Sequence, residues 1–129
     1  MLWYESSWLL SIWIGVGGFL GTVSRYYVSQ IIPRVFPSSF PYATLFINLV
    51  GSFLLGGLVG ADIHSTTFEL FFGVGFLGAF TTFSTLNYES LQLGLQKQWT
   101  PLLVYLGVTY SMGIIFAFAG YLIFKIHVG

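Results

Sequence analysis

The sequence predicts an all-α integral membrane protein with four transmembrane helices, the third of which contains a candidate break. Three observations support this: charged residues make up only 6% of the 129 residues, four long stretches carry no charge, and the segments between them are short. Soluble domains contain roughly 25% charged residues, so this chain cannot build a water-compatible surface. Residues 1–129 are therefore expected to form a single transmembrane domain.

The first predicted helix covers about residues 7–32 and the second about residues 42–61. The third covers about residues 67–95 and the fourth about residues 101–125. Each contains an uncharged run close to the roughly 20 residues that a helix needs to cross about 30 Å of hydrocarbon. Backbone polar groups in lipid must be satisfied within their own segment, so these runs are expected to be helical.

The connections are short, and no soluble domain remains once the spans are removed. The first connection contains Pro33, Pro37 and Pro41. This segment is expected to leave the helix, because proline lacks the N–H that continues helical hydrogen bonding. Residues 62–65 and 96–99 form the other two connections. Whatever the protein does is therefore expected to happen inside a membrane.

Composition and charge exclude several functional classes. The net charge is zero, so there is no basic field to attract nucleic acid. No cysteine is present, which removes disulfides and thiolate metal sites. No hydrolase-like set of Ser, His and acidic residues converges, and the protein is not expected to be an enzyme. Glu89, at the end of the third span, is expected to be an interfacial carboxylate.

Positive charges are distributed unequally over the two sides of the predicted bundle, but the difference is small. Arg25, Arg34 and Lys97 fall on one side and Lys125 on the other. Positive-inside counting would place the first side in the cytoplasm. A chain with so small a bias can insert both ways or take one orientation. In the first case, two oppositely inserted copies would form an antiparallel dimer.

Small residues recur at a spacing of four within the predicted helices. The pairs are Gly17/Gly21, Gly56/Gly60 and Gly113/Ala117. This spacing lets helix backbones approach closely in a membrane. It predicts a compact bundle.

Polar side chains form a stripe on the second span. Thr44, Asn48 and Ser52 recur every four residues and so share one helix face. One interpretation is hydrogen bonding between helices, which is common for these residues in membranes. The other is an ion pathway, since Asn48 carries two amide N–H donors near mid-span. Tyr105 and Thr109 form a weaker stripe on the fourth span.

A run rich in hydroxyl residues follows Gly78 in the third span. The run contains residues of low helix propensity, which disfavour a continuous helix: Thr81, Thr82, Ser84 and Thr85. A break here would free backbone carbonyls that cannot face lipid and must face protein, water or an ion. The alternative is an unbroken helix whose hydroxyls bond back to the preceding turn.

Three motifs therefore follow one another along the chain: Gly17–Gly21 with Arg25-Tyr26, the stripe on the second span, and Thr81-Thr82-Phe83-Ser84-Thr85 between Gly78 and Glu89. In order and spacing they resemble the Fluc/CrcB family of small dual-topology fluoride channels. The resemblance extends from about residue 15 to residue 120.

The resemblance implies an antiparallel homodimer with two pathways, which exports fluoride passively and relieves fluoride toxicity. Fluoride enters acidified cells as the neutral weak acid and is trapped as the anion, so a channel lowers it when the membrane potential is negative inside. By matching position, the implied pathway residues are Asn48, Phe83, Thr44, Ser52, Ser84, Thr85, Tyr105 and Thr109. The backbone carbonyls of Gly78 and Thr81, with those of the second copy, would hold a structural sodium ion at the dimer interface.

The implied location is a multi-pass position in the bacterial inner (plasma) membrane, with lipid, fluoride and a second antiparallel copy or a paralogous subunit as partners. Two residues depart from the family pattern: Leu86 replaces a second phenylalanine, and Gly113 replaces a hydroxyl residue. A phenylalanine at position 86 is expected to raise fluoride flux without changing dimer stability. The alternatives are a non-conducting partner subunit of a heterodimeric fluoride channel, or a small four-helix multidrug-type exporter. Such an exporter would require a carboxylate in its first helix, and residues 6–24 contain none.

Overall fold

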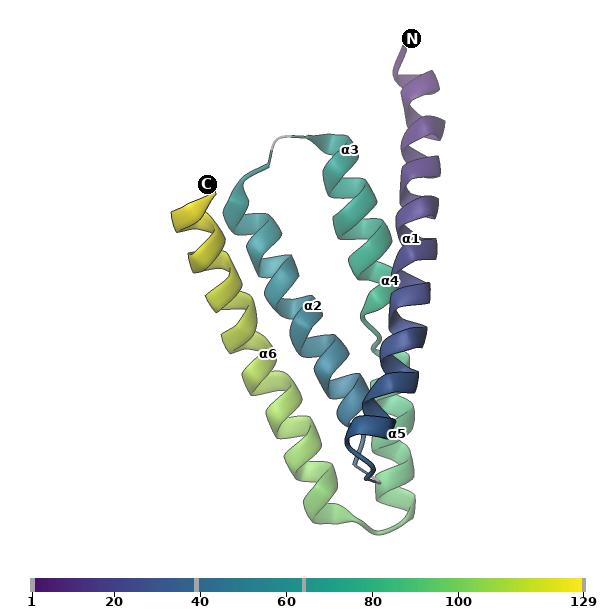
Figure 1. Cartoon of the computed structure of the whole chain (residues 1–129), viewed down its shortest axis with the longest axis vertical. Helices are drawn as coiled ribbons and strands as arrows, with labels where there is room; N and C mark the ends of the chain where they lie inside the picture. The colour runs from purple at the N-terminus through teal and green to yellow at the C-terminus, as the bar shows by residue number, and fades with distance from the viewer. Residues whose placement is uncertain (1, 39, 64, 129) are drawn as a thin grey trace.

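The computed structural model describes residues 2–38, 40–63 and 65–128, with side chains from Trp8 onward. Every regular element in these ranges is helical (Figure 1). The elements are α1 (Leu2–Val35), α2 (Tyr42–Ala61), α3 (Thr66–Phe68), η1 (Glu69–Leu77), α4 (Gly78–Phe80), α5 (Ser84–Leu95) and α6 (Trp99–His127). The third predicted span is thus built from α3, η1, α4 and α5.

Two pairs of helices pack closely through glycine. A Cβ added at Gly56 or Gly60 of α2 would strike backbone carbonyls of α6, and one added at Gly17 or Gly21 of α1 would strike carbonyls of η1. Only a residue without a side chain allows backbones this near each other. The packing role predicted for these two glycine pairs is confirmed. In Figure 1, α2 lies along α6 and α1 lies along the third span.

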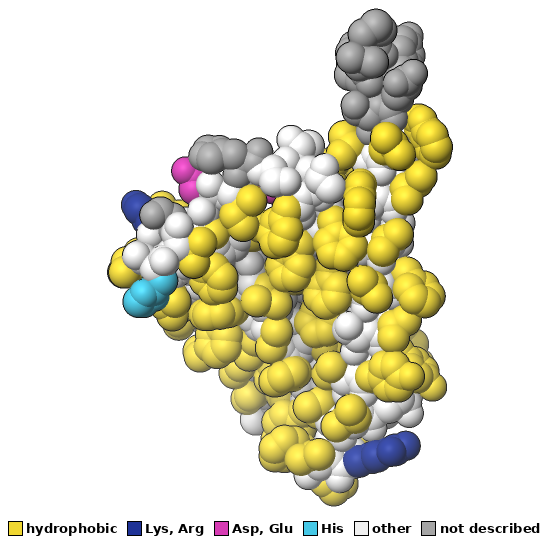
Figure 2. Space-filling view, turned by 45° about the horizontal axis from the view of Figure 1, so that its top comes forward, with side chains coloured by type: hydrophobic (Ala, Val, Ile, Leu, Met, Phe, Trp, Pro, Cys, Tyr) yellow, Lys and Arg dark blue, Asp and Glu magenta, His cyan; other side chains and the backbone are white. Residues whose placement is uncertain are grey.

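The described chain has the dimensions and surface of a membrane protein. Three helical segments are long and apolar enough to cross a membrane: Tyr42–Ala61, Thr66–Leu95 and Trp99–His127. Most of their side chains face outward, and hydrophobic groups cover the face seen in Figure 2. Helix α1 has 34 residues, so it is about 51 Å long and exceeds the thickness of a bilayer core.

Helix α1 extends beyond the expected range of 7–32 and contains Pro33 in its last turn. The chain leaves the helix after Val35, within the segment that contains Pro33, Pro37 and Pro41. A proline this near the end removes one hydrogen bond without interrupting a longer helix beyond it. Arg34, in the same turn, places positive charge at the negative end of the helix dipole. Helix α6 likewise begins at Trp99, before Pro101, because a proline in the first turn needs no helical N–H partner.

The third span changes its winding along its length. Residues Glu69–Leu77 form a π-helix, a wider winding that is uncommon in proteins and frequent near functional sites. Helix α4 then ends at Phe80, Thr81 is extended with ψ 158°, and α5 begins at Ser84. Helix α5 is joined to α6 by an apolar cluster of Leu86, Leu93 and Tyr105. The interruption therefore lies between two packed helical segments.

Candidate functional site

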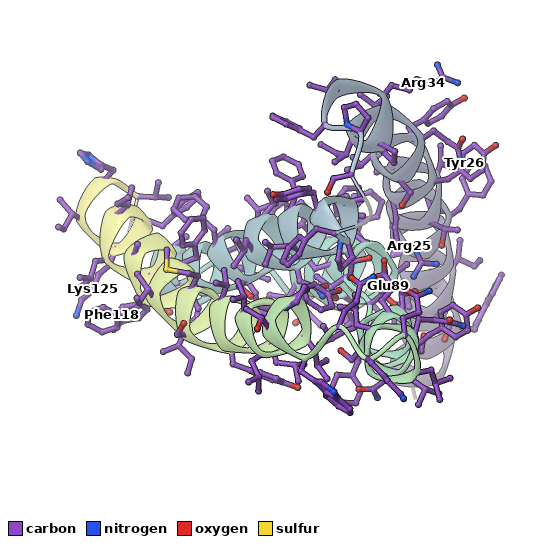
Figure 3. The ribbon with its side chains drawn as sticks, turned by 90° about the horizontal axis from the view of Figure 1, so that it is seen from below. Arg25, Tyr26, Arg34, Glu89, Phe118 and Lys125 are labelled. Atoms are coloured by element: carbon purple, nitrogen blue, oxygen red, sulfur yellow. The ribbon has the colours of Figure 1, made fainter. Side chains whose placement is uncertain are left out.

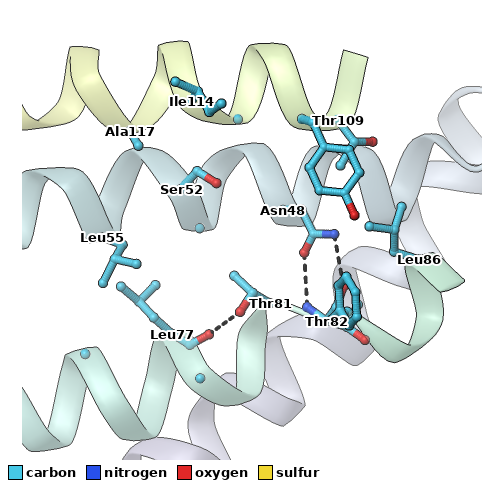
Figure 4. Close-up of a pocket in the computed structure, with 16 residues that line it drawn as sticks. Asn48, Ser52, Leu55, Leu77, Thr81, Thr82, Leu86, Thr109, Ile114 and Ala117 are labelled. Carbon is cyan, nitrogen blue, oxygen red and sulfur yellow. Dashed lines mark hydrogen bonds between the residues drawn. The ribbon is translucent and has the colours of Figure 1, made fainter. Parts of the chain in front are cut away.

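The interruption between α4 and α5 is held by Asn48 of α2. Its Nδ2 donates to the Thr82 carbonyl at 3.0 Å, and its Oδ1 accepts from the Thr82 N–H at 3.0 Å (Figure 4). One side chain therefore replaces both hydrogen bonds that the Thr82 peptide groups would make in a helix. The predicted stripe residue Asn48 faces the interruption, and one of its two amide N–H groups is used there.

The carbonyls of Gly78 and Thr81 are among those that lose their helical partners at the interruption. In a continuous helix the Thr82 N–H would bond to the Gly78 carbonyl, but it bonds to Asn48 instead. The Thr85 N–H would likewise bond to the Thr81 carbonyl, but it donates to the Thr82 hydroxyl at 3.2 Å. A Cβ added at Gly78 would have no neighbour within 4 Å, so this side of the chain is open.

A cavity of about 520 Å³ lies beside the interruption, between α2, the third span and α6. Its lining includes Asn48, Ser52, Phe83 and Thr109, four of the predicted pathway residues. The Thr109 hydroxyl is buried and finds no hydrogen-bond partner among the described residues. A buried unpaired hydroxyl is costly unless water or a ligand satisfies it. Thr109 therefore brings an unsatisfied hydroxyl to the wall of the cavity.

A second pocket of about 320 Å³ lies between the end of α1, the following loop, α2 and α5. Thr44, Thr85 and Glu89 line it. The Thr44 hydroxyl donates to Glu89 Oε1 at 2.5 Å, and the Tyr105 hydroxyl donates to the same oxygen at 3.4 Å. Two predicted pathway residues therefore direct their hydroxyl groups at a carboxylate.

Glu89 is the residue that sequence reasoning undervalued. It was expected to be an interfacial carboxylate, yet it accepts hydrogen bonds from two other helices. A signal was present, because an acidic residue within a predicted span requires partners inside the bundle. Those partners could not be named from the sequence, since Thr44 and Tyr105 lie far from Glu89 along the chain.

The remaining hydroxyl residues connect the two pockets. The Thr82 hydroxyl donates to the Thr85 hydroxyl at 3.1 Å, so a residue of the first cavity contacts a residue of the second pocket. Ser84 is exposed, with its hydroxyl 3.5 Å from that of Thr82, and lines neither pocket. Apart from Ser84, the predicted pathway residues therefore divide into two groups that are joined through Thr82 and Thr85.

Phe83 and Leu86 have opposite environments. The Phe83 side chain is 64% exposed at the edge of the first cavity. Leu86 is 3% exposed and packs in the cluster with Leu93 and Tyr105, although it also borders the cavity. Position 86 is thus part of the core between α5 and α6.

A bound cation would depend on backbone oxygen. Among the described residues, no group of three or more His, Asp or Glu side chains is placed to hold a metal ion. The Gly78 and Thr81 carbonyls, released from helical bonding, are the type of ligand that sodium takes where membrane helices unwind. Two carbonyls cannot surround an ion, so a complete site would need ligands from elsewhere.

Comparison with known proteins identifies close relatives. The family model described as "CrcB-like protein, Camphor Resistance (CrcB)" matches residues 12–121. A Geobacillus kaustophilus protein named "Fluoride-specific ion channel FluC 1" is 47% identical over 118 residues, which cover 92% of this chain and 96% of the relative. "Fluoride-specific ion channel FluC 2" of Bacillus cereus is 45% identical, covering 83% of this chain and 90% of the relative. "Fluoride-specific ion channel FluC 1" of Listeria monocytogenes is 44% identical with the same coverage.

Proposed function

Since this chain belongs to the CrcB family, we propose that fluoride crosses the membrane along the polar groups around the interruption of its third span. The protein is a multi-pass membrane protein and a fluoride channel, not an enzyme. The observation that carries the proposed route is the buried Thr109 hydroxyl, which has no hydrogen-bond partner among the described residues. It lies in the wall of the cavity of about 520 Å³, which Asn48 and Ser52 also line. These groups can donate hydrogen bonds to a partly dehydrated anion.

Transport of this kind is passive. A membrane potential contributes about 2.3 kcal/mol per charge for each 100 mV, so a cell that is negative inside expels fluoride through an open path. Coupling to protons or to a second substrate is not required. The small multidrug-type exporter is not favoured, because the relatives are named as fluoride-specific channels.

The working unit is an antiparallel dimer in which α1 also crosses the membrane. The first cavity is bordered by Phe83, Tyr110 and Ile114, which are 64%, 52% and 72% exposed. A cavity with polar groups in its wall that opens through such a face would meet lipid in a single copy. A second copy packed against this face would close the cavity and cover the aromatic ring of Phe83. The positive edge of that ring could then face the anion.

A sodium ion between the two copies fits the same arrangement. The Gly78 and Thr81 carbonyls of one copy, joined by those of the other, would hold it, and the open side of Gly78 leaves room for this approach. The ion would supply fixed positive charge, which lowers the cost of an anion in a low-dielectric surrounding. Asn48 and Thr82 contribute by keeping those two carbonyls free of helical hydrogen bonds.

Reconstitution tests this function directly. The purified chain is placed in liposomes loaded with potassium fluoride or potassium chloride, and efflux is followed with ion-selective electrodes after a potassium ionophore is added. Rapid loss of fluoride with retention of chloride is the expected result. Equal loss of both anions would contradict selectivity. Absence of fluoride loss from the pure chain, restored by a second paralogous chain, would instead identify a heterodimer subunit.

A further inference from the structure

We propose that Gly51 is a positioning residue for the fluoride route, because its missing side chain leaves a notch in α2 that receives the methyl group of Thr81. The inference rests on the proposed route beside the interruption and concerns how the chain is held there. A Cβ added at Gly51 would overlap Thr81 Cγ2, and the next nearest atom outside α2 would be Thr81 Cβ. Gly51 is buried, and both residues line the first cavity.

The notch at Gly51 differs from the contacts of the other glycines of α2. A Cβ added at Gly56 or Gly60 would strike a backbone carbonyl of α6. One added at Gly57 would strike the ring of Phe124, also on α6. These three glycines therefore hold α2 against α6. Gly51 instead faces the third span, at the point where that span is interrupted.

Both branches of the Thr81 side chain are in use. Its hydroxyl donates to the Leu77 carbonyl at 2.8 Å (Figure 4), while its methyl group occupies the notch at Gly51. Threonine is branched at Cβ, so the positions of the two groups are linked through one torsion angle. The methyl group can leave the notch only if the hydroxyl gives up its hydrogen bond or the backbone moves. The notch therefore sets where Thr81 lies along α2.

The notch and Asn48 act on consecutive residues of the interruption. Gly51 lies three residues after Asn48, so the two share one face of α2. Asn48 binds the N–H and the carbonyl of Thr82, and Gly51 receives the side chain of Thr81. The first contact is polar and the second is steric, and together they direct the chain into Phe83. The exposed ring of Phe83 borders the cavity, so its placement depends on both contacts.

The helical segments on either side of the interruption are held in place. Helix α4 packs against α1, and α5 is held by its apolar cluster with α6. Glu89 of α5 also lies among the helices, whereas Arg34 and Lys125 project from the bundle (Figure 3). Carbon atoms pack at about 3.5–4.0 Å, so a methyl group on residue 51 would displace Thr81 by on the order of 1 Å. Binding groups must be held within about 0.5 Å of their working positions, so this displacement would impair conduction.

Moving one methyl group across the contact tests this role. Fluoride efflux from liposomes is measured for Gly51→Ala, for Thr81→Ser and for the double variant, and each rate is divided by the amount of folded protein that size-exclusion chromatography recovers. Gly51→Ala should lower efflux roughly tenfold, and Thr81→Ser, which keeps the hydroxyl and empties the notch, about threefold. The double variant again has one methyl group at the contact. Its efflux should exceed that of both single variants and lie within about twofold of the native rate.

Gly56→Ala is the matched control on the same helix. Its Cβ would strike the Ala117 carbonyl of α6, so adding Thr81→Ser should bring no recovery. If Gly51→Ala alone does not fold, the comparison of Thr81→Ser with the double variant still decides, because the added methyl group must raise efflux per folded protein.

Two results would overturn the positioning role while leaving the proposed function intact. One is a double variant that conducts no better than Thr81→Ser. The other is a folded Gly51→Ala protein with a lower unfolding temperature but native efflux per folded protein, as a purely structural role would give. A native chain that releases no fluoride would overturn the proposed function and this inference together, before any variant is compared.

Discussion

Asn48 and Thr82 hydrogen-bond to each other in both directions, with Asn48 Nδ2 on the Thr82 carbonyl and Asn48 Oδ1 on the Thr82 N–H, each at 3.0 Å. Asn48 lies on α2 and Thr82 lies in the interruption of the third span, 34 positions away in sequence. The pair satisfies backbone groups that would otherwise be unbonded in a membrane interior, where such groups are costly. The interruption of the third span is thus stabilised by a side chain of the second.

Replacing Asn48 should therefore affect both stability and conduction. Asn48→Ala leaves the Thr82 N–H and carbonyl without partners, at about 1–3 kcal/mol each. We expect a lower unfolding temperature in detergent and loss of fluoride efflux. Asn87→Ala, which removes an exposed amide from α5, serves as the matched control and should leave both unchanged. Asn48→Asp retains only the acceptor, so a variant as stable as the native chain would show that the donated bond is dispensable.

Phe83→Leu tests the role of the exposed ring at the cavity. The side chain is 64% exposed, so leucine should be tolerated in the fold of the single chain. If the ring edge stabilises the permeating fluoride by about 1–2 kcal/mol, its loss would slow fluoride efflux roughly five- to thirtyfold. Phe118→Leu changes a ring of similar exposure, 62%, on α6 and is the control. Equal efflux from both variants would remove Phe83 from the pathway.

Leu86→Phe tests the residue that departs from the family pattern. The sequence predicts a gain in fluoride flux at unchanged dimer stability. Within one chain, however, Leu86 is 3% exposed in the cluster of α5 and α6. A larger ring in a filled core costs about 1–3 kcal/mol. We expect a lower unfolding temperature together with higher flux per folded protein. Thermal unfolding and efflux, measured on the same preparation, separate the two effects, and unchanged stability would show that the ring turns into the cavity.

Gly113→Ser should restore a hydroxyl on the fourth span. A Cβ at Gly113 meets only Ser52 Oγ, at 3.6 Å, so the side chain fits. One further donor worth about 1 kcal/mol in the cavity would raise fluoride efflux roughly fivefold. Gly120→Ser, also on α6, is the contrasting variant, because its Cβ would strike the Phe53 carbonyl and disrupt packing against α2. A Gly113→Ser protein that folds but shows no increase in fluoride efflux would place the added hydroxyl outside the fluoride pathway.

Orientation in the membrane can be measured with a C-terminal tag. One side of the bundle carries Arg25, Arg34 and Lys97, and the other carries Lys125. This difference in positive charge gives only a small bias in orientation. If the chain forms antiparallel homodimers, the tag should be accessible from both sides of the membrane in comparable amounts. Labelling from one side only would show a single orientation. The antiparallel partner would then have to be a different chain.

Much of the architecture follows from the sequence for a simple reason. Lipid cannot hydrogen-bond to the backbone, so uncharged runs of sufficient length must become helices, and their approximate limits can be read from composition. Glycine pairs at a spacing of four similarly indicate close helix contacts, as found at Gly17/Gly21 and Gly56/Gly60. The third span was identified as unusual from Gly78 and its following hydroxyl residues alone.

The sequence by itself determined the class of protein, the approximate spans and the polar residues worth examining, because these depend on local composition and on periodicity along one helix. Only the tertiary structure decided which groups meet. In the folded chain, Asn48 hydrogen-bonds to the Thr82 backbone, and Thr44 and Tyr105 hydrogen-bond to Glu89. Leu86 packs in the core. Each of these contacts joins segments distant in sequence, and their pairing depends on how the helices are rotated and offset. That geometry is fixed by close packing at several interfaces at once, which no single segment encodes.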